Sequence, residues 1–513
     1  MNTATICILV AIVLYLLMMV TVGLVQSRKT KNTSDFYLGG RKLGPFVTAM
    51  SAEASDMSGW LLMGLPAVAL MGGLPEAAWT AIGLAVGTYI NWLIVSKRLR
   101  IYSEKLGAVT IPEYFSKRFG DKKNILTCIA AVVIVIFFVP YTASGFSACG
   151  KLFASLFGVD YHFAMIASAA IITLYCTLGG FLAASTTDFV QSIVMTIALF
   201  VVIGFGEGIT GGFGTVFANA GSMNGYLDLF KGFDVGKGVT TSYGALPVFS
   251  TLAWGLGYFG MPHILLRFMA IESPSKLKTS RRVASIWVVI SMAVAVLIGI
   301  VGFSLMKNGV VGPYADASAA ETIIVDIARA LSKYGIIPAV TAGIILSGIL
   351  ASTMSTADSQ LLAAASSITQ DLTQHTFKVK LSEKFSMWFA RIAVIVIAII
   401  AVFIAWDSTS SVFRIVSFAW AGFGAAFGPV MLCSLFWKRS NKWGALAGMI
   451  AGGITVFVWK FVVREVFSGT ILDIYELLPA FIVALVAIVV VSLLTKAPEK
   501  EVTDVYEEAR KAM

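Results

Sequence analysis

The chain has 513 residues, of which 58% are hydrophobic and only 13% are charged, and its mean hydropathy is +0.86. Soluble domains carry about 25% charged residues, so this composition excludes a soluble globular protein. The net charge of +10 does not indicate nucleic-acid binding, because most of the 38 lysines and arginines fall in alternate loops between apolar segments.

Apolar segments of about 20 residues, long enough to cross a hydrocarbon core of about 30 Å, recur along the whole chain. The sequence therefore predicts an all-α polytopic membrane protein with 13 transmembrane helices, at 5–25, 45–70, 76–96, 124–150, 160–180, 188–210, 244–270, 283–306, 336–370, 386–406, 411–437, 443–463 and 471–495. The first segment is longer than the core of a signal peptide and no basic residue precedes it, so we expect it to be retained as a helix.

Basic residues set the predicted orientation of these helices. Lysines and arginines gather in the loops 26–44, 97–123, 271–282, 371–385 and 438–442 and in the tail 496–513. Because basic loops stay in the cytoplasm, we expect the N-terminus outside and the C-terminus inside a bacterial-type plasma (inner) membrane. The lipid bilayer is then the expected surrounding, and no obligate protein partner is evident from the sequence.

The sequence lacks the residue patterns of transition-metal sites, phosphate-binding loops and enzyme active sites. The three histidines and five cysteines lack the spacing of a transition-metal site. No GxxxxGK[ST] string for cradling phosphates occurs, and the buried polar residues do not form a set of nucleophile, base and orienting group. We therefore expect no cofactor and no enzymatic activity.

The second segment is interrupted by polar residues. Residues 53–60 read EASDMSGW, and Gly59, Gly64 and Pro66 favour a break in the helix. An ionised Asp56 at the bilayer centre costs at least about 2.5–3.5 kcal/mol on insertion scales. We expect it to help organise a cation site, with an ion pair to a distant basic residue as the alternative. The alternative for the glycines is close helix packing without any ligand.

The seventh segment has a matching interruption, WGLGYFGMPH at 254–263, five helices after the first. Two five-helix halves would place their first helices at these positions. Interrupted helices at corresponding positions of two halves indicate the binding site of a transporter, because unwound turns free carbonyls for a cation and helix ends for a carboxylate.

The ninth segment carries a row of hydroxyls. Ser352, Ser355, Thr356 and Ser359 follow the i, i+3, i+4, i+7 spacing of one helix face. Such hydroxyls commonly bond to carbonyls of their own helix, but four in a row make an oxygen-rich face that suits a hard cation. We expect Asp358 to point away from this face, toward a loop or a partner.

Asp188 stands at the start of the sixth segment, on the side expected to be cytoplasmic. An aspartate in the first turn of a helix is ordinarily a capping and dipole residue. The same carboxylate could instead serve a cation, and the residues alone leave the choice open.

Long strings of this sequence resemble the sodium:solute symporter family, and most closely its proline-transporting members. The strings are LGGRKLGPFVTAMSAEASDMSGWLLMGLP (38–66), YTASG (141–145), GGFLAASTTDFVQ (179–191), WGLGYFGMPHILLRFMAI (254–271), ILASTMSTADSQLL (349–362) and FAWAGFGAAFGPV (418–430). The chain departs from the pattern at Glu53, where the family has a small residue, and at Met261, where it often has glutamine.

The resemblance implies a leucine-transporter-like core of two inverted five-helix repeats. One extra helix would precede this core and two would follow it. The divisions would be the first helix and basic loop at 1–44, the first repeat at 45–210, an extracellular loop at 211–243, the second repeat at 244–437, the extra helices at 438–495 and the cytoplasmic tail at 496–513.

The resemblance also implies a sodium site between the second and ninth helices. Its ligands would be three backbone carbonyls and two hydroxyls, from Ala54, Met57, Ser352, Ser355 and Thr356. Asp56 and Ser55 would support this site, and Arg41, near the cytoplasmic end, would link it to coupling. The chain also has a serine at position 352, where proline transporters often have alanine. Some relatives that bind a second sodium have a serine there and an aspartate that matches Asp188, so a second cation site at Asp188, Ser352 and Thr356 is a further expectation.

A small-molecule substrate is implied as well, with L-proline first and another solute of the family (pantothenate, a sugar, a carboxylate or another amino acid) as the alternative. Its expected site is built from Tyr141, Trp254, Tyr258 and Pro262, with Ser58, Gly59 and Trp60 as the floor. Proline has an apolar ring and two opposite charges, so aromatic walls and a few polar groups suit it. The expected function is therefore sodium-coupled symport of proline by alternating access.

Overall fold

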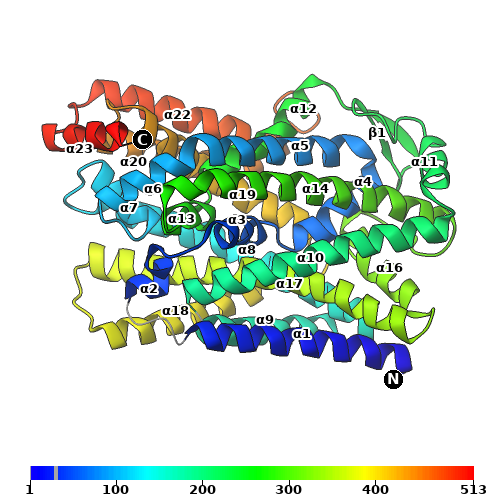
Figure 1. Ribbon diagram of the computed structural model, residues 1–513. Coiled ribbons are helices and arrows are strands. Elements are labelled where there is room, and N and C mark those ends of the chain that lie inside the picture. Colours follow the sequence, from blue (N-terminus) through cyan, green and yellow to red (C-terminus); the bar gives the residue numbers. More distant parts are fainter. Residues whose placement is uncertain (1, 28–32, 179, 513) are drawn as a thin grey trace.

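The computed structural model describes residues 2–27, 33–178 and 180–512. Residues 28–32 of the basic loop 26–44, and Gly179 at the start of the quoted string 179–191, lie outside these ranges. Nearly all of the described chain is helical, and the long helices run side by side (Figure 1). The N-terminus lies at one end of the bundle and the C-terminus at the other (Figure 1).

The helices of the first half begin with α1, which is followed by the short elements α2 and η1. They are α1 (Thr3–Ser27), α2 (Thr33–Leu38), η1 (Gly39–Arg41), α3 (Pro45–Asp56), η2 (Trp60–Gly64), α4 (Leu65–Gly72), α5 (Leu74–Ile90), η3 (Asn91–Val95), α6 (Ser96–Lys105), α7 (Ile111–Arg118), α8 (Ile125–Phe157), α9 (Tyr161–Leu178), α10 (Phe181–Thr210) and α11 (Phe213–Gly221).

The second half begins after a small hairpin, β1 (Lys231–Asp234) and β2 (Val239–Ser242). Its helices are α12 (Ala245–Leu252), η4 (Ala253–Phe259), α13 (Pro262–Ala270), η5 (Pro274–Lys276), α14 (Leu277–Lys307), α15 (Ala317–Ala320), α16 (Ile323–Ser332), α17 (Ile336–Ser366), η6 (Ser367–Thr376), α18 (Glu383–Ile404), α19 (Val412–Phe436), α20 (Lys442–Val458), η7 (Trp459–Val463), α21 (Arg464–Val466), α22 (Leu477–Leu494) and α23 (Lys500–Lys511).

Within the described residues, ten helices are long and apolar enough to cross a membrane. They are Thr3–Gln26, Leu74–Lys105, Ile125–Phe157, Phe181–Thr210, Pro274–Lys307, Ile336–Thr376, Lys384–Ile404, Val412–Phe436, Lys442–Val466 and Leu477–Leu494. The broken pair α3 and η2–α4 passes the same test if it is taken as one span. Large apolar side chains on the outside, such as Trp388 and Phe403 of α18, face where lipid would lie. The chain is therefore a helical polytopic membrane protein.

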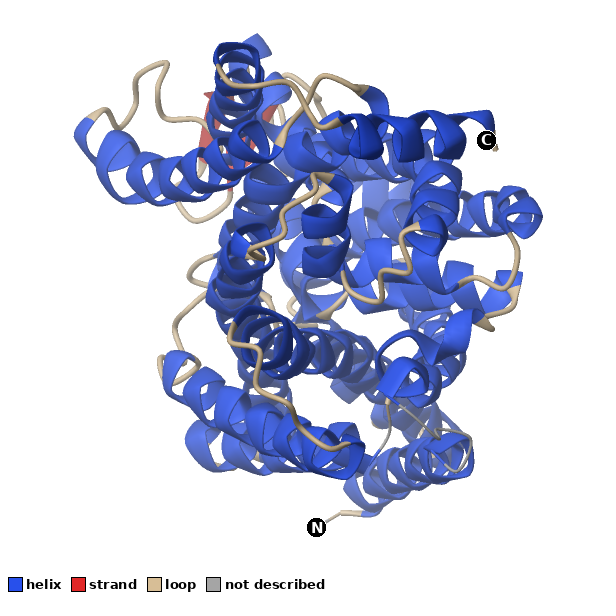
Figure 2. Ribbon diagram, turned by 90° about the vertical axis from the view of Figure 1, so that its left-hand side faces the viewer, coloured by secondary structure: helices blue, strands red, loops and turns tan. Residues whose placement is uncertain are grey.

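Helix α17 lies inside the bundle, where it packs against α10, α1 and α8. Helix α14 packs against α4, α10 and α5, and α3 lies between α10, α14 and α13. The last helices, α20 and α22, pack on each other and on α19. Figure 2, viewed from the end that carries α23, shows the helices gathered around this interior. The broken helix α3 also packs against α17. This contact brings together the residues of the candidate site.

The only described strands form the hairpin in the loop 211–243, where the sequence predicts no strand. Lys231 pairs with Ser242 and Asp234 with Val239 in antiparallel register. The hairpin lies at the same end of the bundle as the N-terminus (Figure 1). At the opposite end, the tail 496–513 forms the short charged helix α23.

Candidate functional site

The second span is broken where the sequence predicts it. Helix α3 ends at Asp56, and Met57 leaves the helical region with φ −81° and ψ 74°. The chain becomes helical again at η2 and α4, which are tilted by 61° relative to α3. Gly59 lies in the break against α8, where a Cβ added to it would come within 2.8 Å of the Cβ of Ala148. Glycine is required here because the two helices approach so closely.

The seventh span is broken as well. Its middle is the 3₁₀-helical η4, and Met261 is extended with φ −75° and ψ 107° before α13 begins at Pro262. A Cβ on Gly260 would come within 2.2 Å of the carbonyl oxygen of Phe423, so this turn also accepts only glycine without a shift of its neighbours. Both interruptions read from the sequence are confirmed.

The break in the second span lies against the hydroxyls of α17. Ser355 Oγ donates to the carbonyl oxygen of Ala54 at 2.8 Å, and Thr356 Oγ1 lies 3.5 Å from the same oxygen. The same two hydroxyls lie 3.2 and 3.1 Å from the carbonyl oxygen of Ser352. Four of the five atoms expected to hold sodium are thus neighbours in a buried cluster that joins segments about 300 residues apart in sequence.

The other hydroxyls of this region have local roles. Ser352 Oγ donates to the carbonyl of Ile349, and Ser55 Oγ donates to the carbonyl of Ala52. Both contacts are hydrogen bonds within one helix, which the sequence analysis weighed as the alternative for such residues. The row of four on α17 therefore divides: Ser355 and Thr356 face the break, whereas Ser359 faces an arginine described below.

Asp56 lies at the centre of a group of aromatic donors. Its carboxylate accepts a hydrogen bond from Tyr258 Oη at 2.7 Å, through Oδ2, while Oδ1 has no hydrogen-bond partner among the described residues. Its main-chain carbonyl accepts from Tyr141 Oη and from Trp60 Nε1, both at 3.0 Å. The structure thus brings three aromatic residues of the predicted substrate site to one aspartate, which is fully buried.

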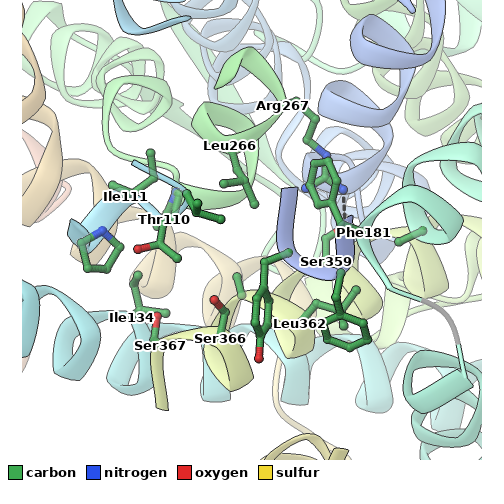
Figure 3. Close-up of a pocket in the computed structure, with 17 residues that line it drawn as sticks. Thr110, Ile111, Ile134, Phe181, Leu266, Arg267, Ser359, Leu362, Ser366 and Ser367 are labelled. Atoms are coloured by element: carbon green, nitrogen blue, oxygen red, sulfur yellow. Dashed lines mark hydrogen bonds between the residues drawn. The ribbon is translucent and has the colours of Figure 1, made fainter. Parts of the chain in front are cut away.

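Two cavities are lined by residues of the predicted substrate site. One, of about 520 Å³, is lined by Trp254, whose ring centre lies 6.1 Å from that of Trp60; we call it the outer cavity, after the orientation that the basic loops predict. The other, of about 30 Å³ and called the inner cavity, is lined by Pro262 and, as Figure 3 shows, by Thr110, Arg267 and Ser359. They share no lining residue. Trp254 and Pro262 therefore line different cavities, and Asp56 lines neither of them.

Glu53 has a partner that the sequence did not reveal. It is fully buried, and its Oε1 accepts a hydrogen bond from Trp92 Nε1 at 2.7 Å. Trp92 and Asn91 lie on the π-helical turn η3, and Asn91 Nδ2 donates to the carbonyl of Tyr258 at 3.1 Å. Such π-turns are frequent at functional sites. Here the turn aims two polar side chains at the broken helices.

Asp188 does not cap its helix. Helix α10 begins at Phe181, so Asp188 lies in the interior of the helix, where its Oδ2 bonds Arg267 Nη2 at 3.0 Å and Ser51 Oγ at 2.7 Å. The capping interpretation was wrong. The predicted span began at 188, where the apolar run starts, but the helix itself begins seven residues earlier, at Phe181. Arg267, three residues before the end of the predicted span 244–270, is also fully buried.

Arg267 is the centre of this second polar cluster. It donates to Ser359 Oγ at 2.6 Å, a contact drawn in Figure 3, and to Ser51 Oγ at 3.0 Å. Asp358, which we expected to face a loop or a partner, is buried in the bundle, and its Oδ1 accepts from Ser359 Oγ at 3.2 Å. The charged residues of α10, α13 and α17 therefore meet inside the protein, which a one-dimensional pattern cannot reveal.

Arg41 lies at the end of the bundle that carries α23, away from the hydroxyl cluster. Its guanidinium donates to the carbonyls of Met269 at 2.6 Å and Ala108 at 2.7 Å, and to Ser103 Oγ at 3.2 Å. Burial, with the nearby Arg100 as a smaller cause, lowers the pKa of Arg41 to about 10, so the group stays charged at neutral pH. It ties the end of α13 to the connection between α6 and α7.

Comparison with known proteins identifies the class. The model of the sodium:solute symporter family matches residues 36–452. The chain belongs to the sodium:solute symporter family. It is 44% identical over 513 residues to the sodium/proline symporter of Haemophilus influenzae, with 98% of each chain covered. It is 42% identical over 498 residues to the high-affinity proline transporter PutP of Bacillus subtilis, covering 96% of this chain and all of the relative.

Solved structures agree on the fold. A Na⁺-coupled sialic acid symporter, solved in a substrate-bound outward-open state, superposes with a TM-score of 0.78 at 17% identity, over 96% of this chain and 98% of its own. MhsT in complex with L-phenylalanine superposes with a TM-score of 0.52 at 14% identity, over 88% and 97%. The leucine-transporter type of fold that the resemblance implied is therefore confirmed at the level of the overall architecture.

Proposed function

We propose that this protein imports L-proline together with Na⁺, as a symporter of the inner membrane. One observation carries the proposal: the carbonyl of Ala54, at the break in the second span, lies 2.8 Å from Ser355 Oγ and 3.5 Å from Thr356 Oγ1. The names of the relatives, which are proline transporters, support the choice of solute.

Sodium would be held by oxygen atoms alone, as hard cations require. The carbonyls of Ala54, Met57 and Ser352 would serve as ligands together with the Ser355 and Thr356 hydroxyls. A hydroxyl that donates to a carbonyl when no ion is bound can turn its lone pairs toward the ion when one enters, so the cluster needs only small movements to bind. Asp56, whose Oδ1 has no partner among the described residues, would supply nearby negative charge.

Proline would bind between the two breaks, beside the ion. Tyr141, Trp254 and Tyr258 would wall its ring, with Pro262 toward the inner cavity, and Ser58, Gly59 and Trp60 would form the floor. The hydrogen bonds of Tyr141, Trp60 and Tyr258 to Asp56 connect this pocket with the broken turn next to the ion. Ion and solute would therefore stabilise one and the same local structure, which is a physical basis for coupling.

Transport would proceed by alternating access. Loading the site orders the broken helices, and the outer and inner paths then open in turn. One charge that crosses about 100 mV contributes about 2.3 kcal/mol, which corresponds to between one and two powers of ten in solute accumulation. Arg41 would act at the inner end, because its bonds to Met269 and Ala108 have to change when that end opens.

The finer architecture is part of the proposal. The broken pair α3–α4 and two shorter apolar helices, Tyr161–Thr177 and Ala245–Phe259, would complete 13 spans. The repeats would cover 45–210 and 244–437, with the N-terminus outside. A second Na⁺ at Asp188, Ser352 and Thr356 also stays a prediction. In this structure Asp188 bonds Arg267, so a second ion would have to share that carboxylate.

Uptake of labelled proline into proteoliposomes tests the proposal. We expect uptake to require an inward Na⁺ gradient and to stop when K⁺ replaces Na⁺. Excess unlabelled proline should compete fully, whereas pantothenate, sugars, carboxylates and other amino acids should compete weakly. Competition by one of these solutes but not by proline would change the assigned cargo. Uptake that is unaffected by removing Na⁺ would overturn the coupling.

A further inference from the structure

The extra helices at the C-terminal end contribute a residue to the outer path. We propose that Tyr475, in the connection that leads into α22, is the lid residue over the solute site and must separate from Trp254 for the outside path to open. The inference rests on the proposed function in that it takes Trp254 as part of the solute pocket.

Tyr475 lies directly on Trp254. The two ring centres are 5.2 Å apart and the ring planes differ by 22°, which is a stacked pair. On its other sides Trp254 contacts Phe413, at 5.2 Å between ring centres, and Trp60 at 6.1 Å. Trp254 is only 4% exposed although it lines the outer cavity. The Tyr475 ring is therefore a large part of what separates Trp254 from that cavity.

The polar groups of Tyr475 hold two different helices. Its hydroxyl donates to the carbonyl of Ser417 on α19 at 2.7 Å, and its main-chain N–H donates to Ser250 Oγ on α12 at 2.7 Å. Helix α12 is the outer part of the broken seventh span, and it leads through η4 to Tyr258. One residue therefore bridges the broken span and α19 on the outer side of the site.

The connection between α21 and α22, which carries Tyr475, is held to η7 and α21 by ion pairs of the buried Glu476. Glu476 is fully buried, and its carboxylate lies 3.0 Å from Arg464 Nη1 and 3.6 Å from Lys460 Nζ. Arg464 also contacts Asp473 at 3.1 Å. Since breaking a buried pair leaves an uncompensated charge, this segment is held on the α20–α21 side. When α12 moves, the contacts that can open are those made by Tyr475 itself.

The surroundings fit a path for a zwitterion. The outer cavity of about 520 Å³ is lined by Tyr475 together with residues of both charges, among them Glu76, Arg414, Lys460 and Arg464. Below Trp254 lie Trp60 and Tyr258, which are almost fully buried. A solute entering from this cavity reaches them only after the Tyr475–Trp254 stack separates.

The test compares Tyr475→Ala with Tyr475→Phe, which keeps the stacked ring and loses only the bond to Ser417. The first measurement needs no solute. In a background without the five native cysteines, Ser58→Cys reports access to the site, and its reaction with a membrane-impermeant maleimide is timed from the outside. We expect Tyr475→Ala to speed labelling about threefold or more, because it removes an aromatic pair and a hydrogen bond. Tyr475→Phe, which loses only the hydrogen bond, should speed labelling less.

Tyr334→Ala is the matched control, because Tyr334 is also near this end of the bundle but is 66% exposed and lines neither cavity. It should leave labelling unchanged. In proteoliposomes, Tyr475→Ala should raise KM for proline and the dissociation rate of bound proline by similar factors, with kcat less affected. A lower Tm with unchanged labelling, KM and dissociation rate would show a purely structural role and overturn the inference. Because labelling is independent of the cargo, this result is separate from failure of proline uptake.

Discussion

Two polar clusters lie one helical turn apart on α17 and differ in their counter-charge. At Ser355 and Thr356, hydroxyls meet the carbonyls of Ala54 and Ser352, and among the described residues no basic side chain bonds either hydroxyl. One helical turn further on, the hydroxyl of Ser359 accepts a hydrogen bond from Arg267, which pairs with Asp188. Both clusters are buried and both contain serine hydroxyls. In the first the hydroxyls meet main-chain carbonyls, and in the second they meet charged side chains.

The difference shows what makes an oxygen-rich cluster a candidate ion site. A guanidinium already occupies the second cluster and supplies positive charge through a fixed set of bonds. The first cluster lies beside Asp56, whose bonded partner Tyr258 is neutral, so a bound cation would be its counter-charge on the proposal above. Buried hydroxyls thus belong to an internal ion pair in one place, and we propose that they bind a mobile cation in the other.

The largest expected effect comes from removing the fixed charge. Arg267→Met leaves Asp188 buried without a base, and breaking a buried pair costs about 3–5 kcal/mol. We expect a large fall in the Tm of the detergent-purified protein and in its abundance in the membrane. The double variant Arg267→Met/Asp188→Asn removes both charges and should recover part of the loss. A single variant as stable as the parent would mean that the two clusters do not differ as described.

The second prediction removes hydroxyls from the other cluster. Ser355→Ala combined with Thr356→Ala should raise the Na⁺ concentration for half-maximal proline uptake at least about tenfold, since a hydrogen bond or ligand contact to a charged group contributes about 1.5–3 kcal/mol. The Tm should change little. Ser347→Ala is the control on the same helix, because its hydroxyl bonds only the carbonyl of Gly343 at 2.8 Å. Equal Na⁺ dependence in both variants would contradict the ion site.

A smaller effect is expected at the link between ion and solute. Tyr258→Phe loses the 2.7 Å bond to Asp56 and leaves that buried carboxylate less satisfied. A bond of this kind is worth about 1–2 kcal/mol, a factor of roughly 5–30. Apparent affinities for Na⁺ and proline should therefore fall together, as measured by Na⁺-dependent proline binding to purified protein. Tyr334→Phe should change neither, and a loss confined to proline would separate Asp56 from the ion site.

The smallest expected effect on binding is at Arg41, which belongs to neither cluster. Arg41→Lys keeps the charge but cannot reproduce the planar contacts to Met269, Ala108 and Ser103. We expect the maximal rate of uptake to fall while equilibrium binding of proline stays within about twofold of the parent, an energy change below about 0.5 kcal/mol. A strong loss of binding would show that the end of the bundle that carries α23 acts on the site itself.

Local patterns predicted the broken spans correctly. Glycine and proline in EASDMSGWLLMGLP and WGLGYFGMPH indicate breaks because each removes helix stability within a few residues, and the structure has both breaks. The hydroxyl row on α17 follows from helical spacing, and its meeting with Ala54 followed from the resemblance to the family. These features depend on residues that are close together in the sequence or on long strings typical of the family. They could therefore be predicted from the sequence.

Contacts between distant helices were the parts that local patterns missed. Asp188 was open between a helix cap and a cation ligand, Asp358 was expected to face a loop or a partner, and Arg267 stands near the end of the predicted span 244–270. All three are buried and lie close together. Trp92 binds Glu53, and Tyr475 covers Trp254, without any signal in their own segments. A charged residue looks the same in sequence whether its partner is water or a guanidinium on another helix.

The sequence by itself determined that the chain is a helical membrane protein, where two of its helices break and which residues carry oxygen at those breaks. Hydropathy, helix period and the backbone chemistry of glycine and proline act over a few residues, so one dimension is enough to read them. Only the tertiary structure decided which buried charge has a partner in the protein and which residue stacks on Trp254. Those outcomes depend on distances between helices far apart in the chain, and electrostatic and packing energies follow distance in space.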